Sequence, residues 1–184
     1  MKLKEHKLPV LVLFEGWGAS GKGTTIGRVI KYIDPRFFKV ATMSKPTEDE
    51  LRRPFLYRYF NQIPEAGKFT FLDSGWMEQT CKDCLNGLEE EDYAKRIDSI
   101  KHFERQLTDN GYLVLKFFMQ IDKKEQEKRF RQRQENPEKQ WKITEEDWRN
   151  REKWEQYEEA VNEMLIRTST EYAPWIVVEG NDKY

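Results

Sequence analysis

The sequence lacks most of the features that would place it in a specialised class of protein. Its two cysteines, Cys81 and Cys84, form a single Cys-x-x-Cys with no second pair, within a segment of helical spacing, so a zinc or redox site is not indicated. The longest apolar run, residues 8–14, is too short to cross a membrane and no signal-type cleavage region follows it. With 32 Lys and Arg against 33 Asp and Glu, the net charge of −1 creates no overall field for nucleic acid or an anionic membrane. We therefore expect a soluble, cytoplasmic protein that binds neither, and any anion site must be local.

The length and periodicity predict one α/β domain over residues 1–184. Apolar segments rich in β-forming residues lie at 10–15, 38–43, 69–73, 112–121 and 175–179. Segments of helical spacing lie at 22–33, 47–62, from 76 onward, and at 90–110, 123–135 and 145–167, the last opened by a capping box from Thr144 to Asp147. This alternation predicts a parallel five-stranded sheet flanked by helices.

The stretch FEGWGASGKGTT, residues 14–25, has the form of a phosphate-binding loop (P-loop, Walker A). It follows an expected strand and opens an expected helix, so successive backbone N–H groups and the helix N-terminus can converge on a phosphate. Glycine-rich turns also occur without a ligand, but the added lysine favours phosphate binding. The candidate phosphate- or nucleotide-binding residues of the loop are Gly16, Gly18, Ala19, Ser20, Gly21, Lys22, Gly23 and Thr24.

The metal site is less clear from the loop itself. In the common form of the motif, Ser or Thr follows the lysine and holds magnesium, whereas Gly23 follows it here and Thr24 or Thr25 would have to supply a hydroxyl. Asp73 ends the expected strand 69–73, where a carboxylate can hold Mg²⁺ against bound phosphates. The alternative is that Asp73 only caps the following helix.

Residues 123–153 form a charged helix, an Asn-Pro turn, a Trp-Lys pair and a second helix. A charged run on a helix is commonly a solvated face. The placement also fits a mobile lid that closes arginines over transferring phosphates, and composition leaves both interpretations open.

Several stretches of the chain resemble the family-two polyphosphate kinases, which move phosphoryl groups between inorganic polyphosphate and nucleotides. The matching stretches are FEGWGASGKGTTI, FLYRYFNQIPEAG, FLDSGW, RFRQRQENPEKQWKITEEDWRNREKW and YEEAVNEMLIRTSTEYAPWIVVEGNDK. The resemblance covers nearly the whole chain. It implies a P-loop nucleoside-kinase-like three-layer sandwich with a helical lid at about 123–153, and Mg²⁺, inorganic polyphosphate and an adenine or guanine nucleotide as ligands. It also implies a homo-oligomer or a second kinase domain C-terminal to this one.

The resemblance implies roles for individual residues. Lys22 would bind the transferring phosphates, Asp73 would hold magnesium, and Arg58 would face a phosphate or the acceptor. Arg129 and Arg133 would be catalytic arginines of the lid. Lys142 would assist these arginines in binding phosphate.

Two positions depart from the family pattern. Gly18 stands where the family has an aspartate, and Ser74 stands where it has an arginine after Asp73. Gly23 is ordinary for the family. In its Gly-Trp-Gly-Ala loop and its Leu-Asp-Ser-Gly-Trp strand end, the chain resembles the N-terminal domain of two-domain polyphosphate:AMP phosphotransferases. We therefore expect it to be a fragment of a longer protein.

Three functions are therefore open. The first is Mg²⁺-assisted phosphoryl transfer between polyphosphate and AMP or ADP. The second is a catalytically degenerate module that binds polyphosphate or mediates dimerisation within a two-domain enzyme. The third is an ATP-dependent nucleotide kinase, which shares the loop but does not explain the lid sequence.

Overall fold

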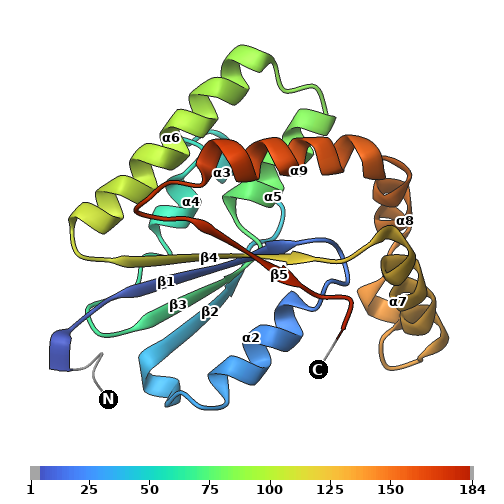
Figure 1. The fold of residues 1–184 in the computed structure, drawn as a ribbon, viewed down its shortest axis with the longest axis horizontal. Helices are drawn as coiled ribbons and strands as arrows, with labels where there is room; N and C mark the ends of the chain where they lie inside the picture. The colour runs from blue at the N-terminus through green and yellow to red at the C-terminus, as the bar shows by residue number, and fades with distance from the viewer. Residues whose placement is uncertain (1–4, 183–184) are drawn as a thin grey trace.

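The computed structural model describes residues 5–182, except for the side chain of Glu146, as helices packed on one parallel sheet (Figure 1). Within that range the sheet has five strands in the order β2-β3-β1-β4-β5. The strands are β1 (Val10–Gly16), β2 (Phe38–Thr42), β3 (Phe69–Asp73), β4 (Leu113–Gln120) and β5 (Trp175–Glu179). Every residue of the central strand β1 is buried, which explains why it is a continuous apolar run interrupted only by one glutamate.

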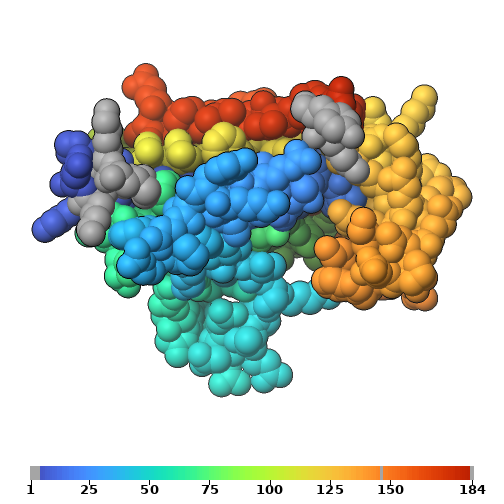
Figure 2. All heavy atoms as spheres, turned by 90° about the horizontal axis from the view of Figure 1, so that it is seen from below, coloured from blue at the N-terminus to red at the C-terminus, as the bar shows by residue number. Residues whose placement is uncertain are grey.

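The helices cover both faces of the sheet, which confirms the predicted three-layer α/β architecture. One face carries α2 (Lys22–Ile30), and the other carries α5 (Trp76–Leu85), α6 (Glu90–Asp109) and α9 (Trp154–Thr168) (Figure 1). The remaining elements are α3 (Glu48–Leu51), α4 (Tyr57–Phe60), α7 (Lys123–Glu135), α8 (Glu145–Glu152) and the 3-10 turns η1 (Pro35–Phe37) and η2 (Gln140–Lys142). The segment α7–η2–α8 lies at the end of the sheet where the strands terminate, as a lobe beside α2 (Figures 1 and 2).

The predicted strands agree with the observed ones to within one residue at each end, but two predicted helices are wrong. The expected helix 47–62 is two short helices, because Pro54 lacks an N–H and disfavours helical geometry in the residue before it. The expected helix 145–167 breaks at Lys153, which ends α8 and begins α9. The capping box between Thr144 and Asp147 is confirmed.

Two clusters of buried side chains hold the layers together. The larger one lies under α5, α6 and α9 and includes Trp76, Ile100 and Met164. The smaller one lies under α2 and includes Phe14 and Ile26. The apolar stripe predicted along residues 154–165 is confirmed as the inward face of α9.

An ion pair lies inside the larger core. The side chains of Lys116 on β4 and Glu104 on α6 have no solvent exposure, and Lys116 Nζ lies 2.7 Å from Glu104 Oε2. Lys116 Nζ also donates to the carbonyl of Thr168 at 2.7 Å and lies 4.8 Å from the ring centre of Trp175. Trp76 Nε1 donates to Glu104 Oε1 at 3.2 Å. Both charges are therefore fully supplied with partners, as burial requires.

Along residues 5–182 no helix is both long and apolar enough to cross a bilayer. Cys81 and Cys84 are free thiols on α5, and Cys81 is buried. The pair is part of a helix, as predicted.

Candidate functional site

The predicted phosphate loop joins β1 to α2 at the end of the sheet where the strands terminate. Gly16 has a φ of +131°, and a Cβ there would overlap the Met119 carbonyl on β4, so only glycine fits. Gly21, with a φ of +106°, is the N-cap of α2. No side chain caps this helix and its first turn holds no acidic residue, so its positive end faces the loop. The backbone therefore has the form of an anion-binding turn.

Lys22 is folded back onto this loop. Its Nζ donates to the carbonyl oxygens of Gly16 at 2.8 Å and Trp17 at 3.3 Å. The positive charge of Lys22 also acts to lower the pKa of Asp73 and of Glu78. Lys22 therefore lies between the loop and a cluster of carboxylates.

Asp73 ends β3 and pairs in register with Phe14 of β1 and Thr42 of β2. A Cβ on Gly23 would lie 3.3 Å from Asp73 Oδ2, so the glycine lets this carboxylate approach the first turn of α2. Burial raises the pKa of Asp73, and Lys22 opposes that rise. The structure therefore explains Gly23 by the close approach of the acid predicted to hold the metal.

Sequence reasoning missed two further carboxylates, Glu15 and Glu78. Glu15 is buried at the end of β1, and its Oε1 accepts from the backbone N–H groups of Met77 at 3.1 Å and Glu78 at 3.3 Å. Burial raises the pKa of Glu15, and the charge of Glu78 raises it further. A charged residue inside an otherwise apolar strand was the available signal, because a buried charge requires partners.

Glu78 lies in the first turn of α5. Burial alone would raise its pKa, but the charges of Lys22 and Lys82 outweigh burial and hold the pKa well below its usual range. Lys82 Nζ lies 2.6 Å from Glu78 Oε1. Among the described residues, neither Oε2 of Glu78 nor Oε2 of Glu15 has a hydrogen-bond partner, although both atoms are buried. Orphaned buried oxygens of this kind indicate a place for a ligand.

This cluster fits a magnesium ion that is also bound to phosphate. In the part of the chain that is described, no three His, Cys, Asp or Glu side chains gather as a metal-binding group. Mg²⁺ in phosphoryl-transfer sites is usually held by one or two carboxylates, with substrate phosphates and water as its other ligands. Asp73 and the orphaned oxygen of Glu78 match that smaller requirement.

A basic cavity of about 410 Å³ opens on one side of the loop. Its cationic lining residues are Arg28, Arg129, Arg133, Lys139 and Lys142, together with loop residues Ala19, Ser20, Gly21 and Thr24. Two acids, Glu179 and Asp182, line it as well. The structure therefore brings half of the predicted phosphate-binding residues to one cavity with an excess of positive charge, whereas Gly16, Gly18 and Lys22 line a different cavity.

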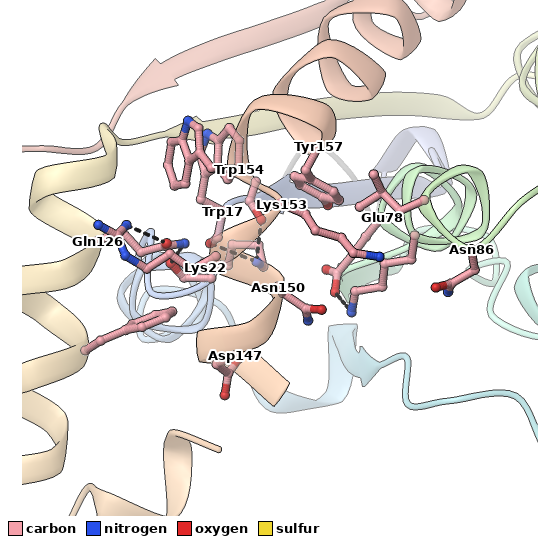
Figure 3. Close-up of a pocket in the computed structure, with 16 residues that line it drawn as sticks. Trp17, Lys22, Glu78, Asn86, Gln126, Asp147, Asn150, Lys153, Trp154 and Tyr157 are labelled. Carbon is pink, nitrogen blue, oxygen red and sulfur yellow. Dashed lines mark hydrogen bonds and ion pairs between the residues drawn. The ribbon is translucent and has the colours of Figure 1, made fainter. Parts of the chain in front are cut away.

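A second cavity, of about 210 Å³, lies on the other side of the loop, and we call it the aromatic cavity (Figure 3). Trp17 of the loop and Trp154 of α9 stack with ring centres 3.6 Å apart, and Tyr157 packs edge-on against Trp17. Glu78 and Asn150 add polar groups to the lining. A cavity with aromatic walls and a few convergent polar groups suits a small organic ligand.

The predicted lid segment is bonded to the loop through its first helix, α7. Gln126 Nε2 donates to the Gly18 carbonyl at 3.1 Å, and the ring of Phe130 lies 3.5 Å from the place of a Cβ on Gly18. Arg151 of α8 then donates to the Lys123 carbonyl at 2.7 Å. The helix α7 therefore packs at ordinary contact distance beside Gly18, which also lines the aromatic cavity.

The predicted lid arginines differ in their surroundings. Arg129 is only 4% exposed and binds backbone carbonyls, which differs from the expected contact with phosphate. Arg133, one turn further along α7, is half-buried and lines the basic cavity. Lys142 lines the same cavity, next to the exposed Trp141.

Arg58 does not lie in either cavity. It is buried on α4, where its Nη2 donates to the Ser44 carbonyl at 2.6 Å and its Nε lies 3.8 Å from Glu50 Oε1. Arg58 therefore holds the backbone of the segment that follows β2. Ser74, at the position where the family pattern has an arginine, has a φ of +66° and donates its N–H to the Phe14 carbonyl.

Comparison with known proteins gives consistent matches along the chain. A family model described as polyphosphate kinase 2 (PPK2) matches residues 1–184. A polyphosphate:AMP phosphotransferase from Pseudomonas syringae pv. tomato is 44% identical over 183 residues, covering 99% of this chain and 36% of that protein. An AMP/ADP-polyphosphate phosphotransferase from Meiothermus ruber is 38% identical, covering 98% of this chain and 67% of that protein. A crystal structure of polyphosphate kinase 2 from Arthrobacter aurescens TC1 matches with a TM-score of 0.94 at 31% identity, covering 98% of this chain and 66% of that one. The chain thus spans about a third of the length of the Pseudomonas relative.

Proposed function

This chain belongs to the polyphosphate kinase 2 family, and on that premise we propose that it binds inorganic polyphosphate at its phosphate loop and transfers a phosphoryl group between polyphosphate and AMP or ADP. The observation that supports this most directly is the basic cavity beside the loop, where four lysines and arginines besides Arg129 line a space open to an extended polyanion. Hydrogen bonds from arginine and lysine to phosphate are charge-assisted and therefore strong. The aromatic cavity, which Lys22 also lines, would take the acceptor nucleotide, with its base against the aromatic side chains of the lining.

Catalysis in this proposal relies on position and charge, because the acceptor is an ionised phosphate at neutral pH and requires no general base. Lys22 would leave the carbonyls of Gly16 and Trp17 and donate to the phosphoryl group in transfer. Arg133 would neutralise charge from the side of the basic cavity. Where single arginines with this role have been measured in other enzymes, they contribute roughly 10³–10⁵ in rate.

Asp73 and Glu78 would hold magnesium, which when bound supplies charge neutralisation to the phosphate oxygens. The fit is supported by the position of Asp73 at the first turn of α2 and by the orphaned oxygen of Glu78. Glu15 would act behind them, because its Oε1 holds the backbone of residues 77 and 78 in place.

The test is magnesium-dependent phosphoryl transfer from polyphosphate to AMP and, separately, to ADP, using the whole chain from Met1 to Tyr184. Lys22→Ala is the matched control, because Lys22 is only partly buried and its hydrogen bonds go to carbonyls of the loop itself. We expect product with the unaltered protein and none with Lys22→Ala. Equal turnover by both proteins would show that neither Lys22 nor the loop takes part in the reaction.

A second candidate function is favoured by the absence of a side chain at Gly18, where the loop lines the aromatic cavity. This is a module that binds polyphosphate with little turnover, and it follows from the loss of two charged groups at Gly18 and Ser74. Phe130 and Gln126 occupy the neighbourhood where an aspartate at position 18 would extend. In a protein as long as the Pseudomonas relative, a second kinase domain could then perform the transfer.

Restoring the two charged groups distinguishes the two functions. If loss of these groups limits turnover, Gly18→Asp combined with Ser74→Arg raises transfer above that of the unaltered chain, while polyphosphate affinity changes little. A combined variant without increased transfer would count against the degenerate-site explanation. Transfer from ATP in place of polyphosphate is measured in parallel, because efficient ATP use would favour a nucleotide kinase.

A further inference from the structure

Arg129 holds a central position between three segments that are far apart in the sequence. Its guanidinium makes five hydrogen bonds, which equals the number of N–H donors that an arginine has. Nε donates to Glu125 Oε1 at 2.8 Å, and Nη1 donates to the carbonyls of Ala19 at 3.1 Å and Ser20 at 3.2 Å. Nη2 donates to the carbonyls of Gly180 at 2.6 Å and Asn181 at 3.0 Å.

From this geometry we propose that Arg129 is a positioning residue, which fixes the backbone of the phosphate loop and does not itself contact the transferring phosphates. The inference deepens the proposed function and rests on it for the identity of the ligand. A guanidinium with all five donors engaged has none left for a phosphate unless an existing bond breaks. With only 4% of the residue exposed, those bonds are shielded from competing water.

The effect on the loop follows from peptide geometry. In a trans peptide the carbonyl of one residue and the N–H of the next point in opposite directions. By holding the Ser20 carbonyl, Arg129 turns the N–H of Gly21 away from α7. The Ser20 N–H is itself fixed on the Trp17 carbonyl at 3.0 Å. Arg129 therefore sets the direction of the loop amide directly before Lys22.

The segment after β5 is the second stretch of backbone that Arg129 holds. Gly180 N–H donates to the Gln120 carbonyl at 2.7 Å, which anchors the segment to β4. A Cβ on Gly180 would lie 3.3 Å from the Ser20 carbonyl, so this segment and the loop are packed closely. Arg129 bridges them from α7. A shorter side chain, or one with a single terminal nitrogen, could not reach both sets of carbonyls.

Arg133 provides a matched control on the same helix. It lies one turn beyond Arg129, is half-buried, and lines the basic cavity. Burial lowers its pKa, while the carboxylate of Asp147 acts to raise it. Lysine serves well where a phosphate needs only a point charge, but it cannot replace a planar fork that binds several carbonyls. Replacement by lysine should therefore have a large effect at Arg129 and a small one at Arg133.

The experiment compares Arg129→Lys with Arg133→Lys and Arg133→Ala in the whole chain, after thermal unfolding has identified a temperature at which all are folded. Without ligand, amide hydrogen exchange across residues 16–23 should rise at least tenfold in Arg129→Lys and stay unchanged in Arg133→Lys. With tripolyphosphate, we expect Arg129→Lys to bind at least tenfold more weakly and Arg133→Lys less than threefold more weakly. Arg133→Ala should also reduce the salt dependence of binding, by a log–log slope of roughly 0.7 for one lost contact to a flexible polyanion.

The outcomes separate this inference from the proposed function. Loop exchange and tripolyphosphate affinity that stay at their original values in Arg129→Lys would overturn the positioning role. Failure of the unaltered protein to bind tripolyphosphate would overturn the proposed function, while the exchange measured without ligand would still decide the role of Arg129.

If Arg129→Lys does not fold, nitrogen NMR of arginine side chains in the unaltered protein takes its place. The Arg129 Nε–H signal should be protected from exchange and keep its shift on addition of tripolyphosphate, whereas the Arg133 signal should move. A ligand-induced shift of Arg129 as large as that of Arg133 would overturn the inference.

Discussion

A fully buried lysine–glutamate pair in the core and a partly buried group of lysine and glutamate at the phosphate loop differ in how completely their polar atoms are paired. In the core, Lys116 donates to Glu104 and both Glu104 oxygens accept a hydrogen bond. At the loop, Lys22 donates to backbone carbonyls and Lys82 binds one oxygen of Glu78, while the second oxygen of Glu78 and one oxygen of Glu15 have no hydrogen-bond partner among residues 5–182. The same residue types thus form a completed network in one place and an incomplete one in the other.

The difference indicates which cluster serves stability and which serves ligand binding. A buried polar group without full pairing costs free energy in the unliganded protein, and proteins tolerate such a cost mainly at functional sites. The incomplete cluster is also the one beside the anion-binding turn. Mutations should therefore have opposite effects on stability at the two places.

The largest effect is expected in the core. Lys116→Met removes one partner of the buried pair and leaves Glu104 without its cation, so the free energy of unfolding should fall by about 3–5 kcal/mol. Urea unfolding measures the loss. The double variant Lys116→Met with Glu104→Leu should recover most of it, because no charge then remains buried. A single variant as stable as the unaltered protein would show that the pair is not needed.

A smaller effect of opposite sign is expected from Glu15→Gln. The pKa of Glu15 is raised in the folded state, mainly by burial, to about 8, so folding is favoured below the unfolded pKa near 4.3 and that contribution is lost as pH rises through 8. Glutamine keeps the Oε1 acceptor for residues 77 and 78 but cannot ionise. At pH 8 the variant should be more stable than the unaltered protein by roughly 1–3 kcal/mol, with little difference at pH 4.

Urea unfolding at several values between pH 4 and pH 8 tests this prediction. Glu104, whose pKa burial raises to about 7, titrates in the same range, but it is present in both proteins and cancels in the difference. A difference that does not grow with pH would contradict the assignment of Glu15.

The third prediction concerns magnesium at the incomplete cluster. With tripolyphosphate present, Mg²⁺ at ten times its dissociation constant should stabilise the unaltered protein by about 1.4 kcal/mol. Glu78→Gln should lose most of this increment, because the orphaned carboxylate is an expected ligand. Asp98→Asn, at an exposed position on α6, is the control and should keep it. Thermal unfolding with and without Mg²⁺ gives the increment, and equal increments in Glu78→Gln and the control would exclude Glu78 from the metal site.

The contrast between the clusters also shows what the sequence could predict. The strands, the phosphate loop and Asp73 follow from local rules, because strand patterning and glycine requirements depend on neighbours in the chain. The break at Pro54 also had a local signal, which the helical spacing outweighed. The sequence near Lys153 contains no proline or similar residue that would predict a break there.

The rest of the site depends on contacts between distant segments. Whether Arg129 contacts phosphate or backbone is decided by residues 19–20 and 180–181, which come near it only in the folded chain. The pairing of Glu15 with the backbone of α5 likewise joins positions 62 and 63 residues apart. Spacing rules identify such residues as charged and do not reveal their partners.

The smallest effect is expected at the edge of the core pair. Trp175→Phe removes the hydrogen bond from Nε1 to Thr168 Oγ1, 2.8 Å long, but keeps an aromatic face toward Lys116. Lys116 retains Glu104 and the Thr168 carbonyl, so the free energy of unfolding should fall by only about 0.5–1.5 kcal/mol, the usual net contribution of one hydrogen bond. Trp175→Leu, which removes the aromatic face as well, should cost more than Trp175→Phe in the same urea titration. Equal losses in the two variants would mean that the ring does not stabilise the buried ammonium, and that Glu104 and the backbone alone complete the core network.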